Sequence, residues 1–410
     1  MSTHRRASAS ATAIACAFIA ARIVISSSDA AAQTSSRPEV PATAPATVTP
    51  VIGSALSSPV AVAATDGKTH IAYELILTNT MLSPTTIHSI KATAGGRTLF
   101  ALSEDELSAS MKNLGSKAPG KVLGAGQSAV VLMDATVERF ADVPGEISHV
   151  LDVEVSQPNL PLLPKNLTQT VATTAIDKRK PIVIKPPLDG PHWVNGNGCC
   201  GVTAHRVALS PLNGKLWAPE RYAVDYVQLN DAGLMYAGDK SSLESYVAFG
   251  AKVHSVADGT VVAVNRGLPE QVPELWPTGL RLNDYGGNYV IADIGNGHYA
   301  FYAHLQNGSV KVNVGDHLRA GQVIGLLGNT GNSSAPHLHF HIIDRPDPLA
   351  ANGLPFEIDS FRLEARIASD ANIDQLAAGG KADYAPNTDV GQRDRQMPLT
   401  FDVMTYKAGN

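Results

Sequence analysis

The chain has 410 residues, which is enough for two or three domains, and 44% of them are hydrophobic, enough to bury real cores. Its formal net charge is only -5, from 32 basic and 37 acidic residues, so charge does not favour nucleic acid as a partner. The 35 glycines, 26 prolines and the 6% share of aromatic residues predict short strands joined by tight turns rather than helical bundles. We therefore expect a mostly β protein.

Residues 1–32 predict a signal peptide. They begin with basic side chains, continue as a largely apolar run from 11 to 25, and end in Ala-Ala-Ala followed by Gln, a small-residue site of the kind that signal peptidase cuts. Arg22 interrupts the apolar run, which argues against a permanent membrane span. We expect cleavage near Ala32 and an exported chain, periplasmic or extracellular, with no integral membrane segment after the leader is removed.

The rest of the chain divides by composition. Residues 33–50 are mainly Ser, Thr, Pro and Ala and predict a linker. Residues 51–176 contain short strand-like runs separated by Gly, Pro and Asn turns, a spacing that predicts an immunoglobulin-like β-sandwich. Because this domain carries no catalytic constellation, we expect a spacer or docking module. Residues 177–198, rich in Lys, Pro and Gly, predict a second linker; residues 199–362 then form the second domain, and 363–410 an irregular tail.

Only Cys199 and Cys200 remain once the leader is removed. Neighbouring cysteines rarely bridge each other because the geometry is strained, so they predict no disulfide framework. Either a vicinal disulfide or two small buried thiols is compatible with the sequence, and a metal role would need a second cysteine pair.

Three histidines alternate in His-Leu-His-Phe-His at 337–341. On a strand, alternate side chains share one face, and neutral imidazole is the commonest protein ligand for zinc. Nine of the 13 histidines lie from His192 onward, which places any imidazole chemistry in the second domain. The alternative is a solvated strand with three surface histidines, but the clustering favours a metal site.

Eight short sequence pieces in this domain share an order with a known family. They lie at 250–253, 258–262, 286–290, 302–305, 314–316, 321–325, 328–331 and 337–340. Together they resemble the lysostaphin/LytM-type zinc endopeptidases over roughly a third of the chain. The resemblance implies a compact antiparallel β domain with a groove, and a zinc-activated water that attacks a peptide bond in the cross-bridge or stem of peptidoglycan.

The resemblance also implies roles for four residues. Asp225 matches the aspartate ligand of the family and His339 matches its histidine ligand. His304 and His337 match the two histidines that do not bind metal but orient the water, take its proton and stabilise the oxyanion. For His304 the alternative is a hydrogen-bonded histidine at a strand edge. A catalytic zinc needs three protein ligands and one open position, so one ligand is still missing.

The departure from the family lies at Arg221. Family members place a metal-binding histidine four residues before the aspartate, and this chain has arginine there. A guanidinium stays protonated and has no lone pair to give, so Arg221 cannot bind zinc. Either another residue supplies the third ligand or the site is degenerate. The His-Arg pair at 205–206 together with Arg-Tyr-Ala-Val-Asp at 221–225 resembles a divergent branch of the same family, in which the early histidine belongs to the pattern.

His205 is therefore the candidate third ligand. Its segment and that of Asp225 are expected to form a hairpin around Asn213 and Gly214. A two-residue turn would place His205 on the face opposite Asp225, whereas a three-residue loop would place both on one face, about 7–8 Å apart. His341 is the fallback ligand, although it matches a position where the family usually has an acid that supports a ligand.

The insertion at 266–284, with Trp276, interrupts the matched strands and either shapes the substrate groove or is decoration. Two functional classes remain open. The first is an exported zinc endopeptidase acting on peptidoglycan peptides. The second is a catalytically degenerate relative that binds the wall or activates another hydrolase, which the arginine at 221 would support. The presence of His304, His337, His339 and Asp225 favours the enzyme, because a pure binding groove has no use for that set.

Overall fold

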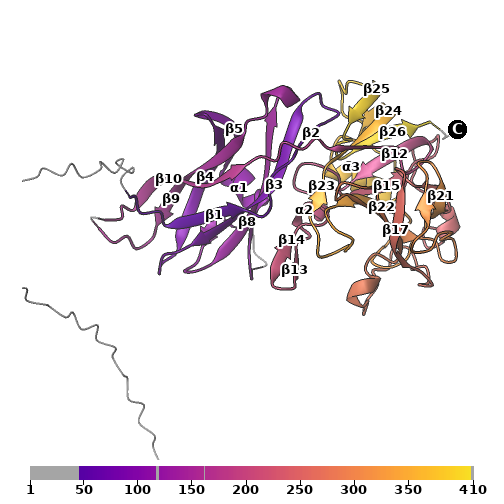
Figure 1. The fold of residues 1–410 in the computed structure, drawn as a ribbon, viewed down its shortest axis with the longest axis horizontal. Helices are drawn as coiled ribbons and strands as arrows, with labels where there is room; N and C mark the ends of the chain where they lie inside the picture. The colour runs from indigo at the N-terminus through magenta and orange to yellow at the C-terminus, as the bar shows by residue number, and fades with distance from the viewer. Residues whose placement is uncertain (1–45, 117–119, 161, 408–410) are drawn as a thin grey trace, which may run out of the picture. The chain divides into compact units, whose positions relative to one another are not determined.

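The first part of the chain forms two antiparallel sheets that face each other. The computed structural model describes residues 46–116, 120–160 and 162–407. One sheet has the strand order β1-β3-β8-β6 with β2 paired to β3, and the other has the order β10-β9-β4-β5 with β7 paired to β4. Figure 1 shows β3 beside β8 and β9 beside β10. The expectation of a mostly β protein is confirmed, whereas immunoglobulin-like connectivity stays a prediction.

Alternation of side chains explains how these two sheets close on one core. The strands of the first sheet are β1 (Val51–Ala55), β2 (Ala61–Ala63), β3 (Thr69–Asn79), β6 (Met111–Asn113) and β8 (Ser128–Val137). Those of the second are β4 (Thr85–Ala94), β5 (Arg97–Ser103), β7 (Val122–Leu123), β9 (Glu146–Val155) and β10 (Asn166–Ala175). Helix α1 (Glu104–Ser110) and the 3-10 turn η1 (Phe140–Asp142) complete the module. Every second residue of β9, such as Leu151 and Val153, is buried in this core.

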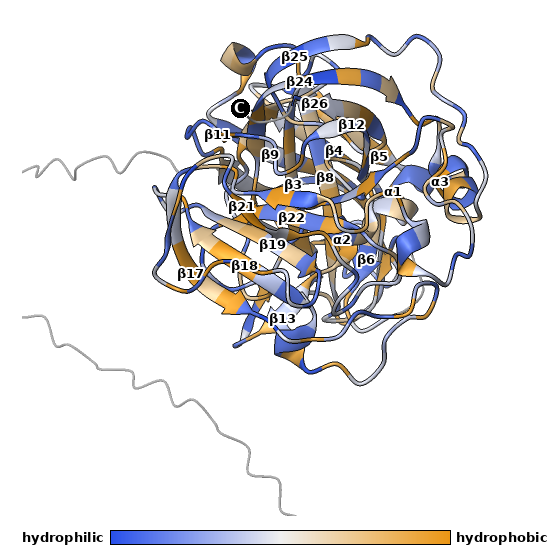
Figure 2. Ribbon diagram, turned by 90° about the vertical axis from the view of Figure 1, so that its right-hand side faces the viewer, coloured by the Kyte–Doolittle hydropathy of each residue, from blue (hydrophilic) through white to orange (hydrophobic). Residues whose placement is uncertain are grey.

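The second part is built on one large sheet. Its strand order is β11-β24-β26-β12-β15-β22-β19-β18-β17-β20, with β23 paired to β22 and β25 paired to β24. In chain order the strands are β11 (Ile182–Ile184), β12 (Gly190–Gly196), β15 (Val224–Gln228), β17 (Gly259–Asn265), β18 (Asn288–Asp293), β19 (Tyr299–Leu305), β20 (His317–Leu318), β22 (Leu338–Ile343), β23 (Gly353–Leu354), β24 (Phe356–Arg366), β25 (Gly391–Gln396) and β26 (Asp402–Tyr406). Figure 2 shows β17, β18, β19 and β22 side by side in that order.

Shorter elements surround this sheet. They are the hairpin of β13 (Ser210–Leu212) and β14 (Lys215–Trp217), the pair of β16 (Lys252–His254) and β21 (Val323–Leu326), helices α2 (Ala204–Val207) and α3 (Asp370–Ala377), and the 3-10 turns η2 (Leu243–Ser245) and η3 (Leu282–Asp284). Cys199 and Cys200, just before α2, are buried and joined by a disulfide.

Two parts of the predicted domain organisation are wrong. The segment 177–198, predicted as a linker, contains β11 and β12, and β12 lies between β15 and β26 in the sheet. The segment 363–410, predicted as an irregular tail, contains the end of β24 together with α3, β25 and β26. Some of these strands pair far along the chain, β11 with β24 and β12 with β26, which no local pattern reveals. Met404 and Tyr406 of β26 are fully buried against that sheet.

The predicted signal peptide and most of the predicted 33–50 linker lie outside the described residues. Among the residues that the structure does describe, helices are too short or too polar to cross a bilayer.

Candidate metal centre

The middle of the large sheet brings Asp225 and His339 together. Asp225 on β15 lies directly opposite His339 on β22, and Ala303 on β19 lies opposite His339 on its other side. Directly opposed residues in an antiparallel pair have Cβ atoms about 4.5–5.5 Å apart. Their side chains consequently meet, with Nδ1 of His339 2.9 Å from Oδ1 of Asp225.

The alternation along β22 sorts its side chains as the sequence predicts. Leu338, Phe340 and Ile342 are buried in the main core cluster of this sheet. His339 and His341 lie on the other face, where both rings contact Phe301 of β19. His337 comes one residue before the strand begins. The apolar face anchors the strand, and the opposite face presents imidazoles.

His205 also reaches this face, but by a different route from the one predicted. It lies in α2, where the side chain of Thr203 caps the helix by accepting a hydrogen bond from the backbone N–H of Arg206. Nε2 of His205 lies 3.1 Å from Oδ2 of Asp225, and its Nδ1 lies 3.1 Å from the carbonyl oxygen of Ala223. The ring meets that of His339 edge to face, with centroids 4.8 Å apart.

The hairpin around Asn213 and Gly214 does form, but it excludes His205. Both residues have positive φ angles, 51° and 74°, as a two-residue hairpin turn requires. The turn pairs Ser210 with Trp217, so the strand begins five residues after His205. The hairpin thus has the predicted two-residue turn, but its pairing does not extend to His205, so the explanation of how His205 approaches Asp225 was wrong.

His304 and His337 form a pair beside these three residues. Their ring centroids are 4.7 Å apart. Nδ1 of His304 lies 2.8 Å from the carbonyl oxygen of Thr330, and Nδ1 of His337 lies 2.8 Å from that of Ala335. Since a carbonyl oxygen only accepts, each Nδ1 carries a proton, and in the neutral His304 this leaves the lone pair on Nε2. Nε2 of His337 is 3.3 Å from Oδ1 of Asp225.

Two glycines allow the loop that holds His304 to approach so closely. Gly287 and Gly331 both have positive φ, and a Cβ on Gly331 would lie 2.2 Å from the nitrogen of Gly287. This close approach brings Thr330 against the end of β19, the strand that carries His304. His304 itself has a φ of 60°, a strained conformation for a histidine of the kind that structures retain at functional sites.

Burial and neighbouring charges set the ionisation of the cluster. Burial alone would raise the pKa of Asp225, but His205 and His337 hold that pKa well below its ordinary value. Burial opposes protonation of His205, yet Asp225 raises the pKa of His205 to about 9. Burial lowers the pKa of His304 well below its ordinary value, and the nearby His337 and His339 add to this effect. The carboxylate is thus ionised, and His304 is neutral at pH 7.

These side chains suit a zinc ion. Ligand atoms of His205, Asp225 and His339 all lie within 4.8 Å of one another, and two imidazoles with one carboxylate make a donor set that zinc accepts. Asn197, which lies in the segment predicted as a linker, donates from Nδ2 to Oδ2 of Asp225 at 2.8 Å and orients the carboxylate. Its Gly-Asn-Gly context predicts only a turn, so the sequence offers no signal for this role.

Neither Arg221 nor His341 belongs to the proposed ligand set, although the ring of His341 lies 5.0 Å from that of His339. The guanidinium of Arg221 contacts the carboxylate of Glu74 instead of the imidazoles. His341 is fully buried with its ring stacked on Phe301, at 4.9 Å between centroids, and burial lowers the pKa of His341 well below its ordinary value. It is not part of the groups of potential ligand atoms found among the described residues.

The side chains of His205, Asp225, His304, His337 and His339 line one groove of about 450 Å³. Trp276 of the 266–284 insertion and Tyr285 contribute aromatic rings to it, and Ile373 and Leu376 of α3 contribute apolar side chains. The insertion therefore lies at the groove, which was one of its two predicted placements. Helix α3 was missed altogether, because it belongs to the segment predicted as an irregular tail.

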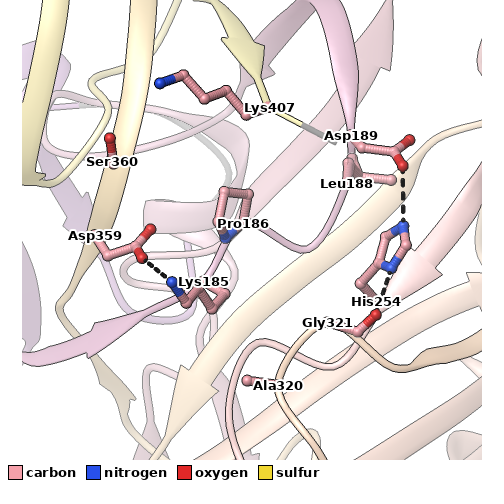
Figure 3. A pocket seen from close by; sticks show the side chains of 10 residues that line it. All are labelled: Lys185, Pro186, Leu188, Asp189, His254, Ala320, Gly321, Asp359, Ser360 and Lys407. Atoms are coloured by element: carbon pink, nitrogen blue, oxygen red, sulfur yellow. Dashed lines mark hydrogen bonds and ion pairs between the residues drawn. The ribbon is translucent and has the colours of Figure 1, made fainter. Parts of the chain in front are cut away.

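Two other places in the molecule gather charged groups without forming a comparable site. In a separate pocket, Lys185 pairs with Asp359 at 2.6 Å, and His254 lies 3.4 Å from Asp189 (Figure 3). Another potential ligand group, away from the groove, combines His70 and Asp134 with Cys200. Because Cys200 is in a disulfide, it offers no thiolate, and we assign neither place a function.

Comparison with known proteins points to one family. Residues 241–351 match the model described as Peptidase family M23. This range includes His304, His337 and His339 but begins after His205 and Asp225. The candidate third ligand, His205, thus lies outside the matched segment.

Several curated proteins are similar over part of their length. Peptidoglycan DD-endopeptidase ShyA of Vibrio cholerae is 35% identical over 133 residues, which is 32% of this chain and 27% of the relative. Glycyl-glycine endopeptidase ALE-1 of Staphylococcus capitis is 34% identical over 105 residues, 25% of this chain and 24% of the relative. Lysostaphin of Staphylococcus simulans is 50% identical over 60 residues, 14% of this chain and 12% of the relative. The chain therefore spans about a quarter of these relatives or less.

Among solved structures, the catalytic domain of lysostaphin from Staphylococcus simulans aligns with 24% identity and a TM-score of 0.23, over 40% of this chain and 88% of that one. A likeness at this level supports no functional conclusion.

Proposed function

We propose that this chain, which carries a domain of peptidase family M23, is an exported zinc-dependent endopeptidase that hydrolyses peptide bonds in the cross-links or stem peptides of peptidoglycan. The observation that carries the proposal is the convergence of His205, Asp225 and His339 beside a second pair of histidines in one groove. The activity named for the relatives supports the choice of substrate.

His205, Asp225 and His339 would hold the metal. Zinc at that place would supply a Lewis acid that lowers the pKa of water and polarises a carbonyl. Asn197 and the carbonyl of Ala223 fix the orientation of Asp225 and His205, so that Oδ2 and Nε2 both point to the same place. These contacts fix the positions of the donor atoms, and His205 would release its proton when the metal binds.

His304 and His337 divide the proton chemistry. The pKa of His304 lies well below its ordinary value, so its Nε2 is free at neutral pH to take a proton from the attacking water. Burial opposes protonation of His337, but Asp225 raises its pKa, which suits a donor to the oxyanion or to the leaving amine. Their rings are 4.7 Å apart, so a scissile peptide group can contact both.

The second candidate function is a degenerate wall-binding protein. Its support is Arg221, which stands where the family has a metal-binding histidine. The position of His205 weakens this second candidate, because an imidazole from α2 lies beside Asp225.

The test is direct. The purified mature protein should contain about one zinc and should release new amino groups from purified peptidoglycan. His304→Ala and His337→Ala should keep the zinc but lower turnover by at least about a hundredfold, the usual contribution of a general base or an oxyanion donor. His317→Ala, which removes an exposed histidine of β20, is the matched control. A zinc-loaded protein that binds peptidoglycan but releases no amino groups would establish the second candidate instead.

A further inference from the structure

Strand β3 of the N-terminal module is covered on both faces. Tyr73 and Leu75 point into the core between the two sheets of that module. Ala72, on the opposite face, belongs to the core cluster of the second domain. Glu74 shares the face of Ala72 and is completely buried. The face that an alternating strand normally turns to water is therefore closed by the second domain.

Glu74 meets two guanidinium groups at this closed face. Nε of Arg221 lies 2.7 Å from Oε2 of Glu74, and Nη2 of Arg221 contacts the same oxygen. Nε of Arg206 lies 3.3 Å from Oε1. The three side chains are at most 4% exposed. Burial alone would raise the pKa of Glu74, but Arg221 and Arg206 hold that pKa below its ordinary value, so the carboxylate stays charged.

Backbone carbonyls accept hydrogen bonds from both terminal nitrogens of Arg206. Its Nη2 donates to the carbonyl oxygens of Tyr73, at 3.0 Å, and Met133, at 3.2 Å, and its Nη1 donates to that of Cys200. Tyr73 and Met133 belong to the adjacent strands β3 and β8. A buried guanidinium is stable only when such contacts replace its hydration, so this arrangement holds Arg206 in one place.

The segment that carries Asp225 is attached to the same strand. The hydroxyl of Tyr222 donates to the carbonyl oxygen of Ala72 at 3.0 Å. Nη1 of Arg221 donates to the carbonyl oxygen of Gly353 at 3.2 Å, which ties this segment also to β23. Arg221 and Tyr222 thus anchor the start of β15 on one side of the metal centre.

The anchored residues are direct neighbours of the proposed ligands. Arg206 follows His205 in α2, a helix of four residues that is too short to be stable without tertiary contacts. Arg221 lies two residues before Ala223, whose carbonyl orients His205, and four before Asp225. A displacement of either arginine must therefore move a ligand.

We propose that Glu74 is a positioning residue for the metal centre, which it serves by holding through Arg206 and Arg221 the two segments that carry His205 and Asp225. The inference rests on the proposed zinc function. It also assigns a role to the residue that departs from the family pattern, because Arg221 contacts the N-terminal module in place of the metal. The module at 51–176 is then a structural part of the metal site, and the expectation of a spacer is replaced.

The test compares zinc affinity in the full mature chain. Glu74→Gln keeps the shape of the side chain and removes its charge, and Glu106→Gln, at an exposed position of α1, is the matched control. We expect Glu74→Gln to weaken zinc binding by at least about tenfold, measured by chelator competition, as other supporting contacts of ligands do. The d–d absorption of cobalt(II) should change with it, since this absorption depends on ligand number and geometry. The control should match the wild type in both measurements.

A second variant covers a failure of Glu74→Gln to fold, which thermal unfolding would reveal. Arg206→Lys keeps the positive charge but cannot reproduce the fork that contacts three carbonyls, so it should also weaken zinc binding. An unchanged affinity and cobalt spectrum in a folded Glu74→Gln, or in Arg206→Lys if Glu74→Gln is unfolded, would overturn the inference while leaving the proposed function intact. A wild-type protein that binds no zinc would instead refute the proposed function, and this inference with it.

Discussion

Replacement of His205 by alanine tests the least expected feature of the site. In the family pattern a histidine four residues before the aspartate binds the metal, and here an imidazole from α2 stands in that place. Nε2 of His205 is 3.1 Å from Asp225, and its ring packs edge to face on His339. His205→Ala would leave two protein ligands, Asp225 and His339, in a groove that is otherwise unchanged.

The expected loss follows from the energetics of zinc sites. Structural sites with four ligands bind zinc with apparent free energies of roughly 10–16 kcal/mol, or about 2.5–4 kcal/mol for each ligand. At about 1.4 kcal/mol for each factor of ten, His205→Ala should weaken zinc binding roughly a hundredfold to a thousandfold. His339→Ala should cause a loss of the same order, because it removes the same type of ligand.

The assay is metal analysis after gel filtration, followed by chelator competition for affinity. His317→Ala serves as control, because this histidine is exposed on β20. Thermal unfolding shows whether each variant is folded. Retention of about one zinc by His205→Ala, with an affinity within a few-fold of the wild type, would refute the assignment and transfer the role to another group.

Three further predictions address other parts of the chain. N-terminal sequencing of the native protein should find a start near Gln33, since the leader ends in a signal-peptidase site; a start at the initiator methionine would contradict export. Arg221→Ala should lower the free energy of unfolding by about 3 kcal/mol in chemical denaturation, because it removes one of the two partners of the buried Glu74; an unchanged stability would contradict the role of this pair. Burial opposes protonation of His70, but two flanking aspartates raise its pKa to about 9, so its contribution is complete below about pH 6.5 and is lost as the pH rises toward 9. His70→Gln should therefore reduce the decline of unfolding free energy across that range by up to about 3 kcal/mol relative to His88→Gln, and parallel pH profiles of the two variants would refute this.

Periodicity explains which parts of the site were predictable. The alternation at 337–341 indicates a strand with imidazoles on one face, and β22 has this arrangement. Asp225 and His339 occupy directly opposed positions, so a correct strand pairing is sufficient to bring them together. Such contacts depend on regular geometry, which the sequence pattern specifies.

His205 could not be placed by the same means. Its helix has four residues, too few to show a 3.6-residue period, and it meets Asp225 through tertiary packing. The hairpin turn was correctly located but has no part in this contact. Similarly, β12 and β26 were missed because each is short and the two pair with each other across about 200 residues of chain.

Glu74 is the one carboxylate in the sequence of β3. A single carboxylate in the apolar run of β3 usually indicates a solvated face, and the alternation of that strand is compatible with this interpretation. Only the structure shows that the second domain covers this face and that two arginines neutralise the charge. Buried charge pairs join positions far apart in sequence, so their partners cannot be inferred from local composition.

The proposed use of His205 as a ligand, in place of a histidine at position 221, has an energetic consequence for the whole chain. A ligand supplied by a strand of the catalytic sheet depends only on that sheet, whereas His205 depends on α2, whose position depends on Arg206 and on strands β3 and β8 of the other module. Zinc binding and the packing of the two modules are therefore linked equilibria. Zinc at a thousandfold excess over its dissociation constant adds about 4 kcal/mol to the stability of the state that binds it. On the proposed role of Glu74, bound zinc would stabilise the contact between the modules as well as the groove.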